Sequence, residues 1–414
     1  MELSENSQLL MEKFMDKYND FLWSEKNLCM DNTNYIFMNF YNDIKKAEDQ
    51  FHRFRDLIKR EIEVSPTYVG IKKGTKYIPS LIQEYSENTF KSVIKYTFKI
   101  LQKQFTINFV IYPDSVDEIE KLEYYIRNIY LWLKISTLYS NNKCGKEVKI
   151  YIHFINSEKY LPTEKFMVLD AINANTAVTT GCQEKGEILI YRKEEWFKVL
   201  IHETFHLLGL DFCDMDCSKI NKHISEIFPI NSEWNIFEAY TEFWATVMNC
   251  IFCSYFAVED EVDNVEEKFI LYADFFIQFE RIFSLYQCSK VLDFMTLQYT
   301  DLIIKTNSFN LYREYLYKEK TNIFSYYILK CILLYNYNDF LLWCDLYNTN
   351  ELQFKQTQYT LDKFAAFISK SYKNSSMIHQ MVDIHDFMKE LQKKNGDSPV
   401  CSTMRMTICE MIKN

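Results

Sequence analysis

The chain is almost free of the residues that break secondary structure. It has 7 glycines and 6 prolines, together 13 in 414 residues, or about 3% where an ordinary soluble protein has about 12%. Folds built from many short hairpins need these residues at their turns, so a β-sandwich or a β-barrel is disfavoured. A mainly helical chain is favoured instead, and its length is enough for two or three domains with sizeable cores.

Charge and hydropathy narrow the class of protein further. The net charge is −10 and the pI is about 5.4, so we expect no nucleic-acid partner, which would need a basic surface. No run of about 18 apolar residues is present, so we expect no membrane segment. The first residues lack the basic and apolar stretches of a secretion signal, which predicts an intracellular protein. In that compartment the 12 cysteines are expected to be free thiols.

The chain divides into a helical start, a mixed middle and a helical end. Residues 1–62 are charged, contain no glycine or proline and carry apolar pairs between polar turns, which predicts helices. From about residue 232 onward almost all apolar spacing is helical. We therefore expect a helical N-terminal region at 1–88, a mixed core at 89–258 and a helical C-terminal domain at 259–414.

Within the middle region the apolar residues alternate as they do in strands. Residues 94–100 and 105–111 alternate on either side of a short polar turn, which predicts a β-hairpin. A capping box formed by Ser115 and Glu118 then begins a helix of about five to seven turns. Three more strands precede a helix that begins near Lys193, and they are expected at Val148–Phe154, Thr176–Thr180 and Glu187–Tyr191.

That last helix carries a sequence with chemical meaning, His202-Glu203-Thr204-Phe205-His206. Residues four apart lie on one face of a helix, so both imidazoles can bind one tetrahedral zinc ion. Glu203 lies beside them, where its carboxylate can reach a water that the zinc activates without itself binding the metal. The strand expected just before the helix is the context that this motif requires.

A catalytic zinc needs a third protein ligand and an open fourth position. Asp211 follows the motif closely, after Gly209, and is one candidate. Glu238 is the other, because it interrupts the apolar face of a later helix together with Glu242, one turn further on. Acidic residues on such a face are rarely buried unless they are paired or bind metal. A ligating Glu238, with Glu242 bonded to a histidine N–H beyond the metal, accounts for both.

These residues together resemble the gluzincin branch of zinc metallopeptidases, typified by thermolysin. The resemblance covers roughly residues 90–255 and implies that His202, His206 and Glu238 bind zinc. It also implies that Glu203 is the general base and that Glu242 supports a histidine ligand. The order of strands resembles the zincin N-terminal subdomain, in which an antiparallel edge strand pairs with an extended substrate. The segment at that position is Thr176–Thr180.

The sequence departs from this family in three places. His206 and Glu238 are separated by 31 residues (238 − 206 − 1), more than in thermolysin-like enzymes. The run that follows His206 resembles the metzincin pattern, but the position six residues after His206 is Phe212, which cannot bind metal, and Asp211 lies one residue away from it. No motif identifies the residue that would steady the oxyanion, and the candidates by residue type are Tyr240, Tyr326, Tyr327, His379 and His385.

A second metal is not expected from the remaining cysteines. Cys213 and Cys217 lie in an irregular segment, and Cys250 and Cys253 lie on an apolar helix where cysteine packs as a small hydrophobic residue. One Zn²⁺ per chain is therefore the expectation.

The stretch 191–206 and the composition also resemble uncharacterised metalloprotease-like proteins of giant DNA viruses, which implies a viral protein of the cytoplasm or the virion. The sequence therefore predicts an α+β protein: a zincin-like core, with a twisted mixed sheet and an active-site helix, flanked by helical regions. Its expected function is a zinc metallopeptidase acting on a peptide or protein substrate. Three alternatives remain: a catalytically silent zincin-fold scaffold or virion protein, a hydrolase of another substrate, and a metzincin-like site with Asp211 as third ligand.

Overall fold

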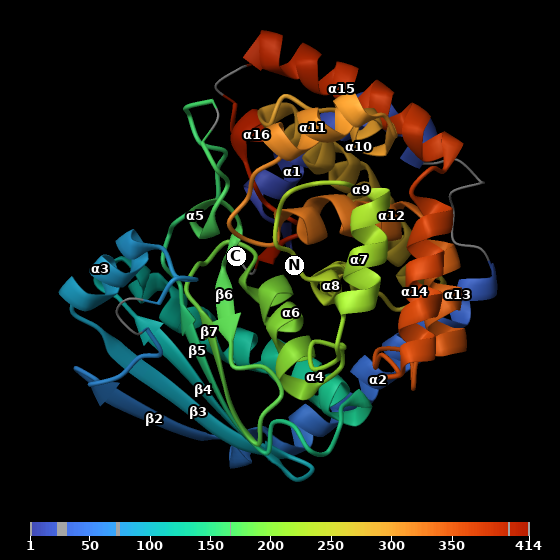
Figure 1. Cartoon of the computed structure of the whole chain (residues 1–414). Helices are drawn as coiled ribbons and strands as arrows, with labels where there is room; N and C mark the ends of the chain where they lie inside the picture. Colours follow the sequence, from blue (N-terminus) through green and yellow to red (C-terminus); the bar gives the residue numbers. More distant parts are fainter. Residues whose placement is uncertain (1, 23–30, 72–74, 166, 396–397, 413–414) are drawn as a thin grey trace.

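A six-stranded mixed sheet forms one side of the molecule and helices form the other (Figure 1). The computed structural model describes residues 2–22, 31–71, 75–165, 167–395 and 398–412. The sheet has the order β2-β3-β4-β5-β7-β6, and its strands are β2 (Lys59–Val64), β3 (Ser92–Ile100), β4 (Lys103–Ile111), β5 (Glu147–His153), β6 (Ala177–Thr179) and β7 (Lys185–Ile190). The chain thus has the expected α+β class.

Helices occur before, between and after the strands of the sheet, and they predominate after residue 195. They are α1 (Glu5–Leu22), α2 (Asp31–Phe54), α3 (Ser80–Asn88), α4 (Leu122–Tyr139), α5 (Ala171–Ala174), α6 (Trp196–Leu208), α7 (Ser218–Ile227), α8 (Ile236–Ala257), α9 (Val265–Phe294), α10 (Tyr299–Ile303), α11 (Asn307–Leu316), α12 (Lys330–Tyr335), α13 (Tyr337–Tyr347), α14 (Gln358–Ser371), α15 (Ser375–Asn395) and α16 (Pro399–Ser402). Tighter 3-10 segments span Arg55–Leu57 and Pro113–Lys121, and a π-helical segment spans Phe324–Leu329.

The two edges of the sheet are both antiparallel. β2, β3 and β4 form an antiparallel meander, β4, β5 and β7 are parallel, and β6 returns antiparallel to β7 at the far edge. The predicted hairpin and the three predicted strands are therefore confirmed. The last of these pairings leaves β6, the segment expected to meet an extended substrate, as the edge strand nearest to α6 (Figure 1).

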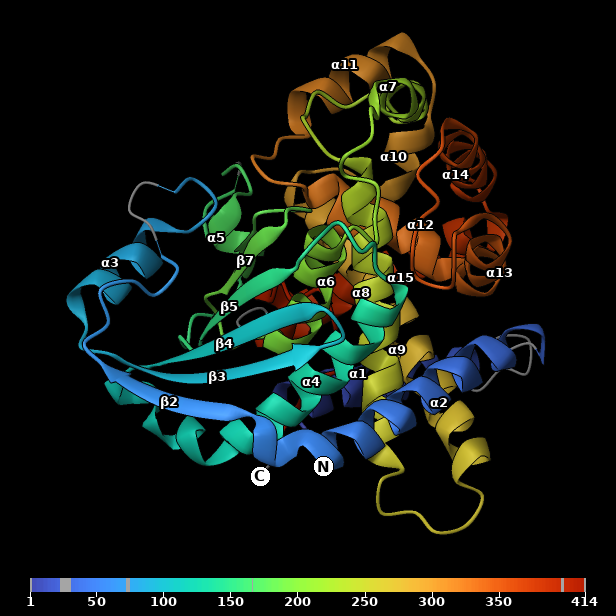
Figure 2. The same cartoon turned by 90° about the horizontal axis from the view of Figure 1, so that it is seen from below.

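Alternate side chains of the strands enter two separate apolar cores. On one face Ile94, Ile107 and Ile150 join the large core formed with α4, α6 and the C-terminal helices. On the other face Val93 and Tyr151 pack with α3 and the segment before it. Seen from below, α2 runs beside α4 on the helical side (Figure 2). Both faces of the sheet are covered. Apolar residues therefore occupy buried positions on both faces of the strands and not on one face alone.

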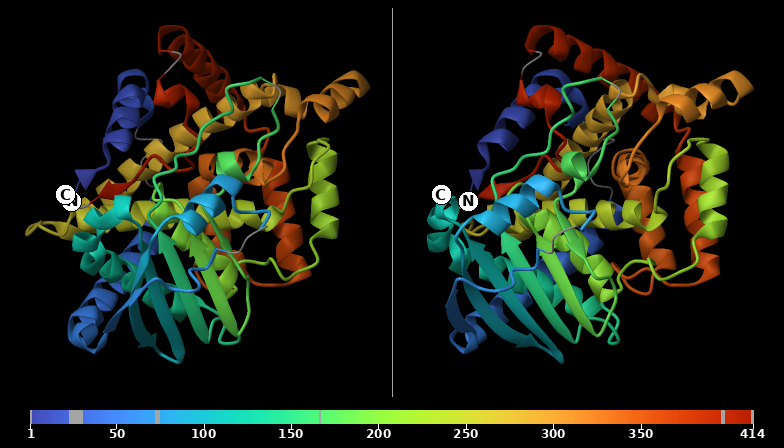
Figure 3. Two further views of the ribbon diagram at one scale, coloured as in Figure 1. Left: turned by 90° about the vertical axis from the view of Figure 1, so that its left-hand side faces the viewer. Right: turned by 60° about the vertical axis from the view of Figure 1, so that its left-hand side comes forward.

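The first and last described segments lie together. β1 (Glu2–Leu3) pairs antiparallel with β8 (Met411–Ile412), and the two ends of the chain lie side by side in both views of Figure 3. The large apolar core runs without a break through residues of all three predicted regions. The boundaries at 88 and 258 remain predictions. No helix among the described residues is long and apolar enough to cross a membrane.

Three sequence expectations are wrong in detail. Residues 59–62, the end of the segment expected to be helical, belong to strand β2, whereas residues 23–30 of the same expectation lie outside the described part of the chain. The predicted capping box is absent, because Ser115 instead accepts a hydrogen bond from the backbone N–H of Tyr112 and Glu118 pairs with Lys193. The helix proper begins only at Leu122. Finally, Cys144 and Cys182 form a disulfide, while the other described cysteines are free as expected.

Helix α6 ends at a glycine that the backbone requires. Gly209 has φ +66°, a left-handed conformation, and the N–H of Leu210 donates to the carbonyl of Phe205 at 2.9 Å to close the helix end. A Cβ at this position would lie 3.0 Å from the sulfur of Cys144. The conformation and the close packing on the disulfide therefore both exclude a larger residue.

Replacing Gly209 by alanine is expected to destabilise the protein by about 1–2 kcal/mol from the left-handed backbone, with a further loss from contact with the disulfide. Gly181→Ala is the matched control, because Gly181 also has a positive φ, +72°, but no atom lies within 4 Å of its added Cβ. Denaturant unfolding of the two variants measures the difference. Equal losses in both variants would contradict the packing argument.

Candidate metal centre

Two packed helices bring three metal-ligating atoms to one point. Helix α6 supplies His202 and His206, and the first turn of α8 supplies Glu238. The Nε2 atoms of the two histidines are 3.1 Å apart, and Oε2 of Glu238 lies 3.1 Å from that of His202 and 3.3 Å from that of His206. Ligands 2.0–2.1 Å from a tetrahedral zinc lie about 3.3 Å apart. The triangle thus has the size of one face of a zinc coordination tetrahedron.

The other nitrogen of each imidazole is held by a carboxylate. Nδ1 of His202 lies 2.9 Å from Glu242, and Nδ1 of His206 lies 2.6 Å from Asp211. A carboxylate accepts the Nδ1 proton, so the Nε2 lone pairs of both rings point to the same place as the Glu238 oxygen. Three acceptors converging at hydrogen-bond distance repel one another unless a proton or a metal cation lies between them. The donor set of two imidazoles and a carboxylate fits Zn²⁺.

Glu242 is itself fixed by a buried cation. Its Oε1 accepts a hydrogen bond from the ammonium of Lys198, one turn before His202, and both side chains are almost fully buried. Burial works to raise the pKa of Glu242, but Lys198 and His202 together lower it to about 2. Glu242 therefore stays ionised and keeps accepting the proton of His202, in the supporting role that the sequence suggested.

Asp211 lies on the opposite side of His206 from the triangle of ligands. Its carboxylate contacts Nδ1, whereas Nε2 is the atom that faces His202 and Glu238. Asp211 accordingly does not converge with both histidines as the metzincin-like alternative requires. It is placed there by the turn at Gly209, and the adjacent Thr241 of α8 lies 3.4 Å from the same oxygen. It orients the ring of His206.

Glu203 stands at the edge of this centre without a structural partner. Its side chain is 8% exposed and lines the same cleft as the two histidines. Among the described residues no hydrogen-bond or ion-pair partner of its carboxylate is found. Burial raises the pKa of Glu203, and the nearby Glu238 adds to this while the two histidines oppose it. A carboxylate that is desolvated and unpaired beside a metal site is suited to accept and return a proton.

The cleft in front of the centre is long and mainly polar. It has a volume of about 1140 Å³. One wall is the edge strand β6 with Thr180 and Gly181, another is the loop at 231–235, and a third is the segment at 319–322 together with Tyr326. This is larger than a single side chain needs. The outer edge of β6 pairs with no strand among the described residues, so it can offer backbone groups to an extended chain.

One of the five residues considered for oxyanion binding faces the cleft. The ring of Tyr326 lies 5.9 Å from that of His202, and it lines the cleft beside Glu203. The hydroxyl groups of Tyr240 and Tyr327 donate instead to the backbone carbonyls of Leu352 and Met404. His379 and His385 lie on α15, outside the residues that line the cleft.

Two residues of the centre were not foreseen from the sequence. Lys198 could have been found, because it lies four residues before His202 on the same face of an otherwise apolar helix. Asn322 could not, since its amide reaches Glu238 Oε1 at 3.3 Å from a loop 84 residues away. That bond turns the other oxygen of Glu238 toward the histidines.

Comparisons with protein-family models, with curated proteins and with solved structures find no match for this chain.

Replacing Lys198 by methionine is expected to destabilise the protein by about 3–5 kcal/mol, because it leaves the charge of Glu242 buried and unpaired. The double variant Lys198→Met with Glu242→Leu should recover much of the loss, since both charges are then removed. Lys219→Met is the control, because Lys219 pairs with Asp362 on the surface and should leave stability nearly unchanged. Denaturant unfolding tests the set. A small effect of the single variant would contradict the pairing.

Proposed function

We propose that the chain is a zinc-dependent metallopeptidase with a zincin-like core. The observation that carries the proposal is the convergence of the Nε2 atoms of His202 and His206 with Glu238 Oε2, with the unpaired Glu203 beside them. The cleft and the free edge of β6 support a peptide substrate over a small molecule, because an extended peptide can add to a sheet edge through its backbone. One zinc per chain at this centre is part of the proposal.

Each residue of the centre has a separate proposed role, which follows from its position. A zinc ion held by His202, His206 and Glu238 would polarise a scissile carbonyl and lower the pKa of a water molecule toward about 7. Glu203 takes the proton of the attacking water and returns it to the leaving amine. Glu242 and Asp211 hold the histidine rings in the orientation that this requires. Tyr326 is the residue best placed to donate a hydrogen bond to the oxyanion.

A silent scaffold is disfavoured by Glu203. A zinc site that only supports the fold needs no base, yet here a fourth polar group, Glu203, lies buried beside the three ligands. Burying a carboxylate without a partner destabilises a fold, so its presence is better accounted for by catalysis.

The disulfide is evidence about the compartment in which the protein is located. Disulfides persist in virions and other oxidising settings and are rare in the cytosol. Of the two locations that the sequence suggested, we therefore propose the virion over the cytoplasm, on the basis of the Cys144–Cys182 bond.

The first prediction from this function concerns the base. Glu203→Gln should abolish hydrolysis of a fluorescence-quenched peptide library while the protein keeps its full zinc content, because the amide cannot accept the proton and is not a ligand. Glu63→Gln, an exposed carboxylate on the opposite edge strand β2, should retain activity. Activity that survives in the Glu203 variant would refute the mechanism.

The second prediction concerns the third ligand. Purified protein should contain one zinc that Glu238→Ala loses or binds far more weakly, because two histidines alone leave the ion half coordinated. Glu233→Ala should keep it. Zinc analysis of the dialysed proteins, before and after reloading, makes the measurement. Full retention by the Glu238 variant would remove Glu238 as a ligand, and absence of this zinc from the reloaded wild type would end the proposal.

A further inference from the structure

A second group of ligating side chains lies outside the cleft, where three elements meet. Cys250 comes from α8, Glu280 from α9 and Cys409 from the C-terminal segment at 403–410. One ligand atom of each lies within 4.8 Å of the others. All three side chains are buried, with exposures of 0%, 0% and 1%. Residues far apart in the sequence thus place two sulfurs and a carboxylate together in the interior.

One oxygen of the Glu280 carboxylate has hydrogen-bond partners, and the other has none among the described residues. Its Oε1 accepts the backbone N–H groups of Ile408 and Cys409 at 2.9 and 3.0 Å, and also the hydroxyl of Thr407. Its Oε2 is buried and has no hydrogen-bond partner among the described residues. A buried polar atom without a partner is costly, and such atoms in native structures often mark an ion or a water. The three bonds to Oε1 fix the carboxylate with Oε2 free to bind.

We propose that Cys250, Glu280 and Cys409 bind a second divalent metal ion, of the zinc class, at a structural site. Two thiolates and a carboxylate suit a borderline-soft ion such as Zn²⁺. Sulfur ligands of a tetrahedral zinc lie about 3.8 Å apart, within reach of the separations found here. On binding, each thiol releases its proton to solvent as its sulfur bonds to the metal.

The charges around this site are balanced. Two thiolates, one carboxylate and a divalent ion sum to −1. Lys330, whose ammonium donates to the carbonyl of Met406 at 2.9 Å, is buried beside the group and supplies the compensating positive charge. A buried cluster with no net charge avoids most of the desolvation penalty of an isolated ion.

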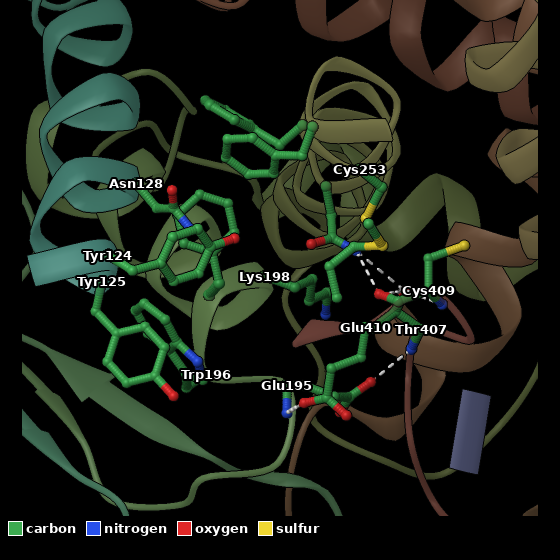
Figure 4. A pocket seen from close by; sticks show the side chains of 15 residues that line it. Tyr124, Tyr125, Asn128, Glu195, Trp196, Lys198, Cys253, Thr407, Cys409 and Glu410 are labelled. Carbon is green, nitrogen blue, oxygen red and sulfur yellow. Dashed lines mark hydrogen bonds between the residues drawn. The ribbon is translucent and has the colours of Figure 1, made fainter. Parts of the chain in front are cut away.

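Room for a fourth ligand exists next to the cluster. A cavity of about 40 Å³ is lined by Cys253, Thr407 and Cys409 among others. Figure 4 shows Cys253 and Cys409 on one side of this cavity and Tyr124 and Tyr125 on the other. The volume exceeds the 10–15 Å³ or so that one water needs. The cavity borders Cys409, so a water in it can reach a metal that this sulfur binds.

The site would fasten the end of the chain to the catalytic helix. Backbone N–H groups of Met406 and Thr407, three and two residues before Cys409, donate to Glu195 at 2.7 and 2.6 Å. Glu195 immediately precedes α6 and has φ +58°, a conformation that needs outside support. A metal that holds Cys409 to α8 and α9 therefore also holds the residues that support the start of α6.

Cobalt substitution tests the proposal independently of the peptidase assignment, because a thiolate bound to Co²⁺ gives a charge-transfer absorption in the near ultraviolet and a histidine–carboxylate site does not. Full-length protein loaded with Co²⁺ should show this absorption. Cys250→Ala and Cys409→Ala should lose it together with about one metal equivalent per chain. Glu238→Ala, Cys213→Ala and Cys288→Ala should retain it, the last being a buried cysteine of α9 away from the site.

Glu280→Gln provides a test that does not remove a sulfur. The variant keeps the shape and the hydrogen-bonding oxygen but loses the charge, so cobalt affinity at this site should fall at least about 10-fold while circular dichroism stays unchanged. Unchanged affinity would overturn the carboxylate's role. An absent thiolate absorption, or its persistence in both Cys250→Ala and Cys409→Ala, would overturn the site. Mass spectrometry that finds Cys250 and Cys409 joined as a disulfide would do the same.

Discussion

The candidate metal centre depends on two buried carboxylates that each accept the Nδ1 proton of a histidine. Glu242 and Asp211 fix both rings in one tautomer, and only in that tautomer do the Nε2 lone pairs converge with Glu238. Ionised carboxylates in an apolar helix pair are unfavourable, so they require compensation nearby. For Glu242 the compensation is Lys198 from the motif helix itself. The acidic groups around the motif are therefore required for the orientation of its two histidines.

Buried charges also need compensation at the start of α6, and the segments that pack around this helix supply it. The start of the helix rests on Glu195, which pairs with Lys159 and accepts two N–H groups from the C-terminal segment. That segment is in turn held by Glu280 of α9. The motif helix is therefore supported at its start by Lys159 from the middle of the chain and by the C-terminal segment.

Much of this arrangement could be predicted from the sequence because it rests on local patterns. The hairpin, the strands β5 to β7 and the spacing of His202 and His206 all follow from periods of 2 and 3.6 residues. Strand β2 has only a short signal of this kind, since Ile62 and Val64 alternate with two glutamates and all six of its side chains are exposed. The roles of Asp211 and Asn322 and the Cys144–Cys182 bond depend on which segments meet in space. No local pattern encodes that.

The chain has few glycines, which first indicated a helical fold. The structure shows that three of them are needed where α6 packs against the sheet. Three of the few glycines gather at the last turn of α6. A Cβ on Gly186 of β7 would lie 2.7 Å from Leu207, and one on Gly145 would lie 2.7 Å from Leu208, while Gly209 ends the helix. These contacts let α6 approach the sheet more closely than side chains would allow. Since β6 is the next strand after β7, that approach sets how deeply His206 lies below the edge where an extended peptide would bind.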